Sequence, residues 1–133
     1  MEVKSLSPNL MVKNVQATVD FYQKTLGFQV LTTVPHAKVE NELQWALLQS
    51  GPVTLMFQEE ENLKEEYPEL VSQKPGGGLT LYMAVRDLSA WYEKVKGTAH
   101  IIQEPHQTFY GATEFAIQDP NGYILTLSEH SND

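Results

Sequence analysis

The 133-residue sequence contains no cysteine. Disulfide bonds, thiolate metal sites and a cysteine nucleophile are therefore excluded. No stretch approaches the roughly 18 consecutive apolar residues of a membrane-spanning helix, and the opening MEVKSLSPNL lacks the apolar segment of a secretory signal. We expect a cytoplasmic protein with no membrane partner.

Basic residues are also few: Lys and Arg number 9 against 17 Asp and Glu, which gives a formal net charge of −8. Nucleic acid binding depends largely on Lys and Arg, so a nucleic acid partner is not expected. The acidity favours cationic ligands through the long-range field, but acidity of this kind also simply keeps proteins in solution. Much of the charge lies in residues 59–69, which we expect to form a solvated connector.

One short pattern occurs twice, as FYQKTLG at 21–27 and as WYEKVKG at 91–97. Each copy ends a segment of helical periodicity, and the two helices are expected to be capped by Asn14 and Asp87. Gly27 and Gly97 are expected to adopt the left-handed conformation that ends a helix. The aromatic pair in each copy would pack against a sheet.

Runs rich in β-branched and aromatic residues flank both predicted helices and indicate strands. The expected strands cover residues 6–12, 28–34, 42–49, 53–58, 79–85, 99–104, 113–118 and 123–129. Both halves therefore follow the order β-α-β-β-β, which predicts an α+β fold. We expect a single domain in which module one is 1–58, the connector is 59–78 and module two is 79–133, because one half alone would bury too small a core.

Four segments carry a family resemblance: NLMVKNVQATVDFYQKTLGFQV, VTLMFQEE, VRDLSAWYEKVKG and YGATEFAIQDPNGYILTL. Together and in this order, they resemble the vicinal oxygen chelate superfamily, the glyoxalase/bleomycin resistance/dioxygenase group. The resemblance implies paired βαβββ modules whose curled mixed sheets surround a cavity, and it implies a homodimer.

The metal enzymes of that superfamily place His, Glu or Gln ligands on cavity-facing strand positions. In this sequence the matching positions hold Ser7, Met56 (or Leu55 with a one-residue slip), Thr80 and Thr126. Hydroxyl and thioether groups are weak ligands for the divalent ions that these enzymes use. The resemblance therefore implies no metal site and no other cofactor, and it places the chain in the metal-free branch, whose best-known members sequester antibiotics.

Alternation along the strands separates an apolar face from a mixed face. The predicted ligand-binding residues are Ser7, Met56, Thr80, Tyr82, Tyr110, Glu114 and Thr126. Both threonines also fit simple strand filler, and Glu114 fits a cation partner, a base or a surface tether. Parity assigns Trp45 to the apolar face, together with Leu43 and Leu47.

Three functions remain open at this point. The first is a metal-free protein that binds a small organic molecule, such as a cationic or aromatic antibiotic-like ligand. The alternative is a lyase- or dioxygenase-type enzyme that uses an unconventional metal site or metal-free acid–base residues, with Glu114, His106 and His36 as the candidates. His36 and His106 are also compatible with ordinary exposed loop histidines. A sensing or partner-binding module is a third possibility.

Overall fold

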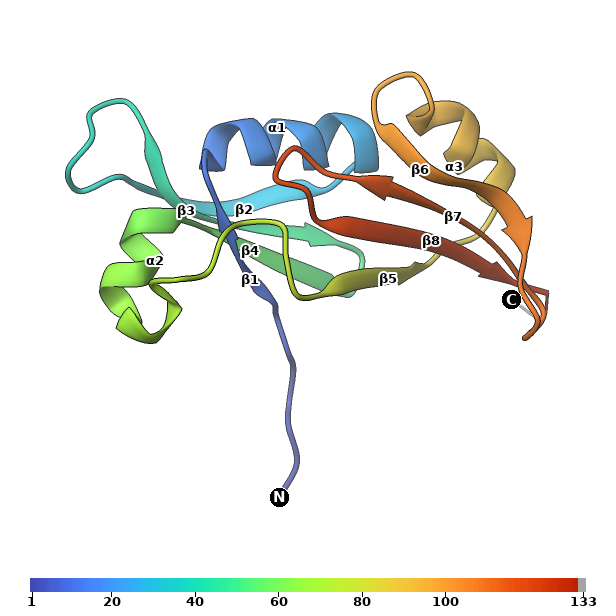
Figure 1. Cartoon of the computed structure of the whole chain (residues 1–133), viewed down its shortest axis with the longest axis horizontal. Helices are drawn as coiled ribbons and strands as arrows, with labels where there is room; N and C mark the ends of the chain where they lie inside the picture. The colour runs from blue at the N-terminus through green and yellow to red at the C-terminus, as the bar shows by residue number, and fades with distance from the viewer. Residues whose placement is uncertain (132–133) are drawn as a thin grey trace. The chain divides into compact units, whose positions relative to one another are not determined.

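The computed structural model describes residues 1–131, in which the chain forms two compact units. Unit 1 is Met1–Pro75, and unit 2 begins at Gly76, inside the segment predicted as a connector. Unit 1 contains β1 (Asn9–Val12), α1 (Val15–Leu26), β2 (Gln29–Pro35), β3 (Leu43–Ser50), β4 (Val53–Glu59), α2 (Glu60–Glu66) and the 3₁₀ turn η1 (Pro68–Leu70). Unit 2 contains β5 (Thr80–Ala84), α3 (Leu88–Val95), β6 (His100–Gln107), β7 (Ala112–Gln118) and β8 (Ile124–His130). The predicted α+β fold of two βαβββ modules is confirmed (Figure 1).

Each unit has a four-stranded mixed sheet, in the order β1-β4-β3-β2 in unit 1 and β5-β8-β7-β6 in unit 2. The first strand of each unit runs parallel to the last, and the other neighbours are antiparallel. The two registers match. In the parallel strand pairs, Asn9 lies opposite Met56 in unit 1, and Tyr82 lies opposite Thr126 in unit 2. In the neighbouring antiparallel pairs, Trp45 lies opposite Gln58 in unit 1, and Glu114 lies opposite Ser128 in unit 2. Asn9, Gln58 and Trp45 therefore occupy the places in unit 1 that Tyr82, Ser128 and Glu114 occupy in unit 2.

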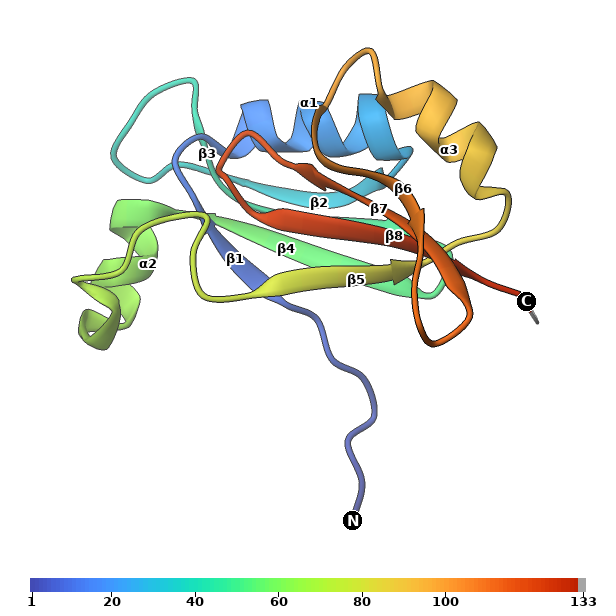
Figure 2. The same cartoon turned by 45° about the vertical axis from the view of Figure 1, so that its right-hand side comes forward.

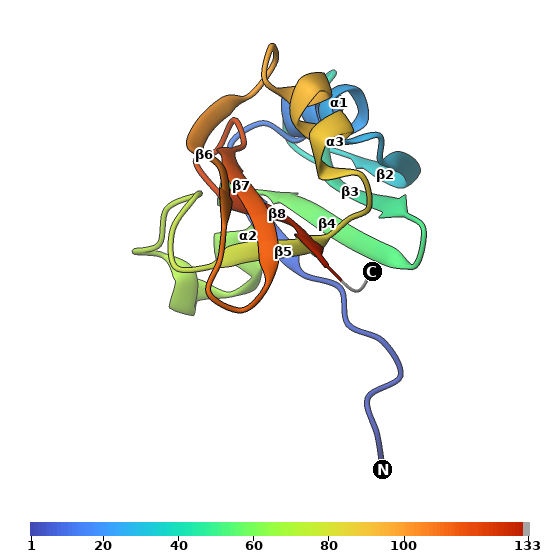
Figure 3. The ribbon, with the colours of Figure 1, turned by 90° about the vertical axis from the view of Figure 1, so that its right-hand side faces the viewer.

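One helix covers one face of each sheet. In unit 1, α1 packs on β2, β3 and β4 (Figure 2), and the ring of Tyr22 lies 4.7 Å from that of Phe57. In unit 2, α3 packs on β7 and β8 (Figure 3), and the ring of Tyr92 lies 5.3 Å from that of Phe115. Both phenylalanines are fully buried. The tyrosine of each repeated aromatic pair thus makes the same contact with its sheet, as predicted.

The predicted ends of α1 are confirmed. The side chain of Asn14 accepts a hydrogen bond from the backbone N–H of Ala17 at 2.8 Å, which satisfies a donor that the helix itself leaves unpaired. Gly27 has a φ of 75°, a conformation that costs most other residues energy.

The predicted ends of α3 are wrong. Asp87 has a φ of 57° and its side chain makes no capping hydrogen bond. The carboxylate of Glu129, from β8, instead accepts from the backbone N–H groups of Asp87 and Leu88 at 2.9 and 3.1 Å. The helix ends at Val95, and Gly97 is not among the glycines with positive φ. A cap supplied by a distant strand cannot be detected from the local sequence.

The prediction of a solvated connector at 59–69 is also wrong, because most of this segment forms α2 and η1. The side chain of Glu59 caps α2 by accepting from the backbone N–H groups of Glu61 and Asn62 at 2.7 and 3.1 Å. Leu63 is buried, and α2 packs on β1 and β4. The segment therefore belongs to unit 1. None of the helices in residues 1–131 has the length and apolar character needed to cross a membrane.

Candidate functional site

The face of each sheet opposite α1 or α3, called here the open face, carries most of the predicted site residues. In β3 the fully buried side chains are those of Ala46 and Leu48, which alternate with Leu47 and Trp45. Trp45 is only partly buried and lies opposite Gln58 in the register. The assignment of Trp45 to the helix-covered face is therefore wrong: its side chain belongs to the open face of unit 1.

Trp45 lines a cavity of about 630 Å³, called here the unit 1 hollow. The cavity combines two aromatic rings, several amide side chains and two carboxylates. Its lining residues are Asn9, Val34, Gln44, Trp45, Gln58, Asn62, Glu65, Glu66 and Tyr67. Its volume is within the range of small-molecule sites, roughly 300–1,000 Å³. Six of the nine lining residues carry amide or carboxylate side chains, so the hollow is more polar than most such sites.

Gln58 organises this hollow and is itself only 7% exposed. Its amide oxygen accepts from Asn9 Nδ2 at 2.8 Å. Its amide nitrogen donates to Asn62 Oδ1 at 2.7 Å and to Glu66 Oε1 at 2.9 Å. Both N–H groups are used, so Gln58 has no donor left for a ligand. Its role is to tie α2 to β1 and β4 and so to fix the carboxylate of Glu66.

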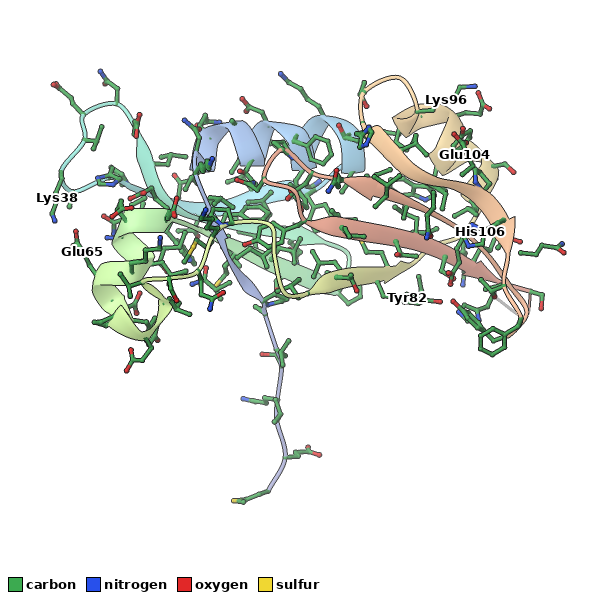
Figure 4. The ribbon with its side chains drawn as sticks, viewed as in Figure 1. Lys38, Glu65, Tyr82, Lys96, Glu104 and His106 are labelled. Carbon is green, nitrogen blue, oxygen red and sulfur yellow. The ribbon has the colours of Figure 1, made fainter. Side chains whose placement is uncertain are left out.

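The carboxylates of the hollow give it a negative character. Among the described residues that line it, none is a lysine or an arginine. Lys38, in the loop before β3, reaches Glu65 on α2 with a distance of 2.7 Å between Nζ and Oε1 (Figure 4). That hydrogen bond and charge pair raise the pKa of Lys38. Both side chains are more than half exposed, so the pair contributes little to stability and can exchange for a ligand cation.

In unit 2 the corresponding positions Tyr82, Glu114 and Ser128, joined by Tyr110, form what we call the Glu114 cluster. Three hydroxyl groups donate to one carboxylate oxygen, Glu114 Oε2. The distances are 2.8 Å from Tyr82, 2.6 Å from Tyr110 and 2.8 Å from Ser128. Glu114 is 6% exposed, whereas the two tyrosines are about half exposed. The predicted residues Tyr82, Tyr110 and Glu114 are thus brought together, and Ser128 was missed.

The hydroxyl donors control the charge of this cluster. Burial raises the pKa of Glu114, but the hydrogen bonds from Tyr110, Tyr82 and Ser128 and the nearby His106 outweigh it, so the net pKa is lowered. The same hydrogen bond to Glu114, aided by burial, raises the pKa of Tyr110 to about 12. Glu114 is therefore held as an anion, and a carboxylate with a lowered pKa is a poor general base.

The remaining predicted ligand-binding residues lie in both units. Thr126 lies opposite Tyr82 on the open face of unit 2, and Thr80 begins β5 on the same face. In unit 1, Met56 lies opposite Leu47 on the open face, and the hydroxyl of Ser7 is hydrogen-bonded to that of Thr54. These positions provide hydroxyl and thioether groups and do not fit a divalent metal ion.

The candidate catalytic histidines have other partners. His36 bonds to Glu59, with 3.0 Å between Nε2 and Oε1. His106 is in β6 rather than in a loop, lies opposite Glu114, and its Nδ1 is 2.8 Å from the carbonyl oxygen of Glu104. Within residues 1–131, no group of three or more His, Asp or Glu side chains is arranged to hold a metal ion.

Several residues of the unit 1 hollow are not among those predicted from the sequence. Gln58 shares the parity of Met56 on β4 and could have been found from alternation alone. Glu65, Glu66 and Tyr67 could not be found in this way, because the charge of their segment indicates a solvated connector. Asn9 is not among the predicted residues, because the family pattern points to Ser7 on the same segment.

Residues 5–127 match the model of the Glyoxalase/Bleomycin resistance protein/Dioxygenase superfamily. A protein of unknown function from Agrobacterium tumefaciens has a similar structure, with a TM-score of 0.77 and 20% identity over 97% of this chain and 95% of that one. A search of curated proteins gave no match.

Two further structures carry family descriptions. A glyoxalase-related enzyme from Fulvimarina pelagi has a TM-score of 0.77 and 16% identity, covering 96% of this chain and 89% of that one. A glyoxalase/bleomycin resistance protein/dioxygenase from Nocardioides has a TM-score of 0.75 and 17% identity, covering 98% and 85%. Identities this low show the shared fold alone, but the family model spans nearly the whole chain, and the resemblance seen in the sequence is confirmed. The protein belongs to the Glyoxalase/Bleomycin resistance protein/Dioxygenase superfamily.

Proposed function

We propose that this protein binds a small aromatic cation in the unit 1 hollow and does so without a metal ion. The observation that supports this most directly is the composition of the cavity, in which the aromatic side chains Trp45 and Tyr67 occur together with the carboxylates Glu65 and Glu66. Cationic aromatic antibiotics fall within this ligand class.

The aromatic side chains supply the apolar contact. Trp45 is partly buried and Tyr67 is 51% exposed, so ring surface is left for a ligand. A cation held over an aromatic ring gains about 0.5–2 kcal/mol, and tryptophan is the best ring for this purpose. A planar ligand gains further stabilisation from stacking.

The carboxylates supply the charge. The amide of Gln58 donates a hydrogen bond to Oε1 of Glu66, so Oε2 is available to a ligand. Because Gln58 is held in turn by Asn9, the position of Glu66 is set before a ligand arrives, which lowers the entropy lost on binding. The acidic character of the whole chain adds a long-range attraction for cations.

We propose no metal-binding role for the positions that hold metal in related enzymes. Ser7, Met56, Thr80 and Thr126 offer neutral oxygen and sulfur, which bind Zn²⁺, Mn²⁺ or Fe²⁺ weakly. For the rival enzymatic function, Glu114 is the best-placed acid–base candidate, and its lowered pKa argues against that role. The unit 2 residues remain predicted ligand contacts, and the homodimer remains a prediction that light scattering can test.

The test is isothermal titration with a panel of aromatic amines and antibiotics, each paired with a neutral analogue of the same ring system. We expect the amines to bind and the neutral analogues to bind at least several-fold more weakly. Trp45→Ala should weaken binding by about tenfold, which corresponds to roughly 1.4 kcal/mol. Trp91→Ala is the matched control, since Trp91 lies on α3 of unit 2 and does not line the hollow. A lack of binding across the panel, or equal binding of neutral analogues, would overturn the proposal.

A further inference from the structure

His36 lies directly after β2 and is the first residue of the loop 36–42, which connects β2 to β3. Its ring nitrogen Nδ1 is 3.1 Å from the backbone nitrogens of both Lys38 and Val39. Its other ring nitrogen, Nε2, is 3.0 Å from Glu59 Oε1. The side chain is 8% exposed. One imidazole therefore joins the loop to the residue that caps α2.

These contacts determine which nitrogen carries the proton. Two backbone N–H groups donate to Nδ1, so Nδ1 must be an acceptor without a hydrogen. The proton of the neutral ring is then on Nε2, which donates to Glu59. Glu59 also accepts from the backbone N–H groups at the start of α2, which lower its pKa against the raising effect of burial. The arrangement fits a neutral imidazole paired with a charged carboxylate.

We propose that His36 is a pH-operated latch that closes the loop 36–42 when neutral and releases it when Nδ1 is protonated. A protonated Nδ1 is a donor and cannot accept from Lys38 and Val39, so both amides must turn to water. The contact from Nε2 to Glu59 survives protonation and becomes a charge pair. Protonation thus detaches the loop from the ring and leaves the ring attached to α2.

The charged groups around His36 lie on several segments. Together with His36, these groups line a cavity of about 410 Å³. The charged residues are Lys13 after β1, Lys38 and Glu42 in the loop, Glu59 at the end of β4, and Glu61 and Glu65 on α2. Glutamates ordinarily stay ionised between pH 5 and 8, and lysines stay charged. Imidazole is the side chain that ordinarily changes charge over this range, so the response is attributed to His36.

The latch acts on the unit 1 hollow, and this consequence rests on the proposed function. The loop carries Lys38, whose ammonium group is bound to Glu65 on α2 (Figure 4). The backbone N–H of Ala37 also donates to Gln44 Oε1 at 3.2 Å, and both Gln44 and Glu65 line the hollow. Release of the loop withdraws Lys38 and frees the carboxylate of Glu65. We therefore expect the hollow to bind a cation more tightly at pH 5 than at pH 8.

Two substitutions separate the two nitrogens of the ring. The amide oxygen of His36→Asn can take the place of Nδ1 as an acceptor, and it does not titrate over this range. The longer side chain of His36→Gln can reach Glu59 in place of Nε2 but offers no acceptor at the Nδ1 position. The first variant should keep the loop closed at both pH values, and the second should leave it open at both.

The readout is amide hydrogen exchange of Lys38 and Val39, measured by NMR at pH 5 and pH 8 and expressed as protection relative to an unstructured peptide. In the wild type we expect protection to fall by about tenfold from pH 8 to pH 5. In His36→Asn the two amides should be protected at both pH values, and in His36→Gln they should be protected at neither. Equal wild-type protection at the two pH values would overturn the proposal, as would a His36→Asn variant that responds like the wild type. Amides in β3 and β4 serve as the control for intact folding.

If either variant fails to fold, the wild-type measurement still tests the proposal by itself. The nitrogen chemical shifts of the His36 ring report its tautomer directly. A neutral ring protonated on Nδ1 would refute the latch. None of these readouts needs a ligand. If the amides respond but no aromatic amine binds, the proposed function fails and the latch survives. If amines bind with no change at Lys38 and Val39, the latch fails and the function survives.

Discussion

Replacing Glu114 by Gln tests whether the Glu114 cluster is built around a carboxylate. The substitution keeps the shape of the side chain but removes the charge that accepts three hydroxyl hydrogen bonds. Hydrogen bonds to charged groups contribute about 1.5–3 kcal/mol, and neutral ones about 0.5–1.5 kcal/mol, so each bond loses roughly 1 kcal/mol. Two of the donors are half-exposed tyrosines, and solvent reduces their share. We expect a loss of about 2 kcal/mol in the free energy of unfolding at pH 7.

The effect should depend on pH in a defined direction. The pKa of Glu114 in the folded chain lies below its ordinary value of 4.5, so the unfolded chain takes up the proton first as the pH falls. The stability contributed by Glu114 is therefore fully present above about pH 4.5 and is lost as the pH falls through the folded-state pKa. Below that pKa, the unfolding free energies of the wild type and of Glu114→Gln should converge.

The assay is urea unfolding at pH 7 and at a series of lower pH values, in a Trp45→Phe background so that Trp91 reports on unit 2. Thr126→Val is the control, because Thr126 is on the same face but is not hydrogen-bonded to Glu114, and its effect should not vary with pH. The reasoning is refuted if Glu114→Gln changes the unfolding free energy at pH 7 by less than about 0.5 kcal/mol, the range of ordinary surface substitutions. A difference that persists unchanged at low pH would refute it as well.

Three further predictions concern stability, each measured by urea unfolding. Gly27→Ala should lower the free energy of unfolding by about 1–2 kcal/mol, because Gly27 has a positive φ. Gly97 has no positive φ and open space around it, so Gly97→Ala should be neutral or stabilising, and equal effects of the two substitutions would contradict the geometry. Glu129→Ala should cost about 1 kcal/mol through loss of the cap on α3, and an unchanged midpoint would count against that role. Gln58→Leu should lower the free energy of unfolding by about 1–2 kcal/mol, because it removes three hydrogen bonds but leaves the exposed Asn9 and Glu66 free to turn to water, and a neutral result would show that α2 is held by other contacts.

The fold was predictable because local and long-range signals agree. Tyr22 and Tyr92 occur in the repeated heptads, and each packs on a phenylalanine of its sheet. The same duplication fixes the order of the strands. The cap at Asn14 acts over three residues and is visible in the sequence. The cap at α3 comes from Glu129 on another strand and is not.

The site was predictable only in part, for two physical reasons. The charge of the acidic segment predicts a solvated connector, but one buried side chain, Leu63, and a cap from Glu59 are enough to dock a short helix on a sheet. Alternation along β3 predicts that Trp45 lies on the more apolar, helix-covered face. The face covered by α1 instead uses the smaller Ala46, and the open face carries the tryptophan. An aromatic ring on an exposed face looks the same in sequence as one in a core.

Titration calorimetry of one aromatic amine before and after treatment of the protein with EDTA tests the central claim most directly. Both preparations should bind the amine with the same affinity and stoichiometry, because Trp45 and Glu66 are proposed to recognise it without a metal ion. Binding that disappears with EDTA and returns on addition of a single divalent metal would contradict the account.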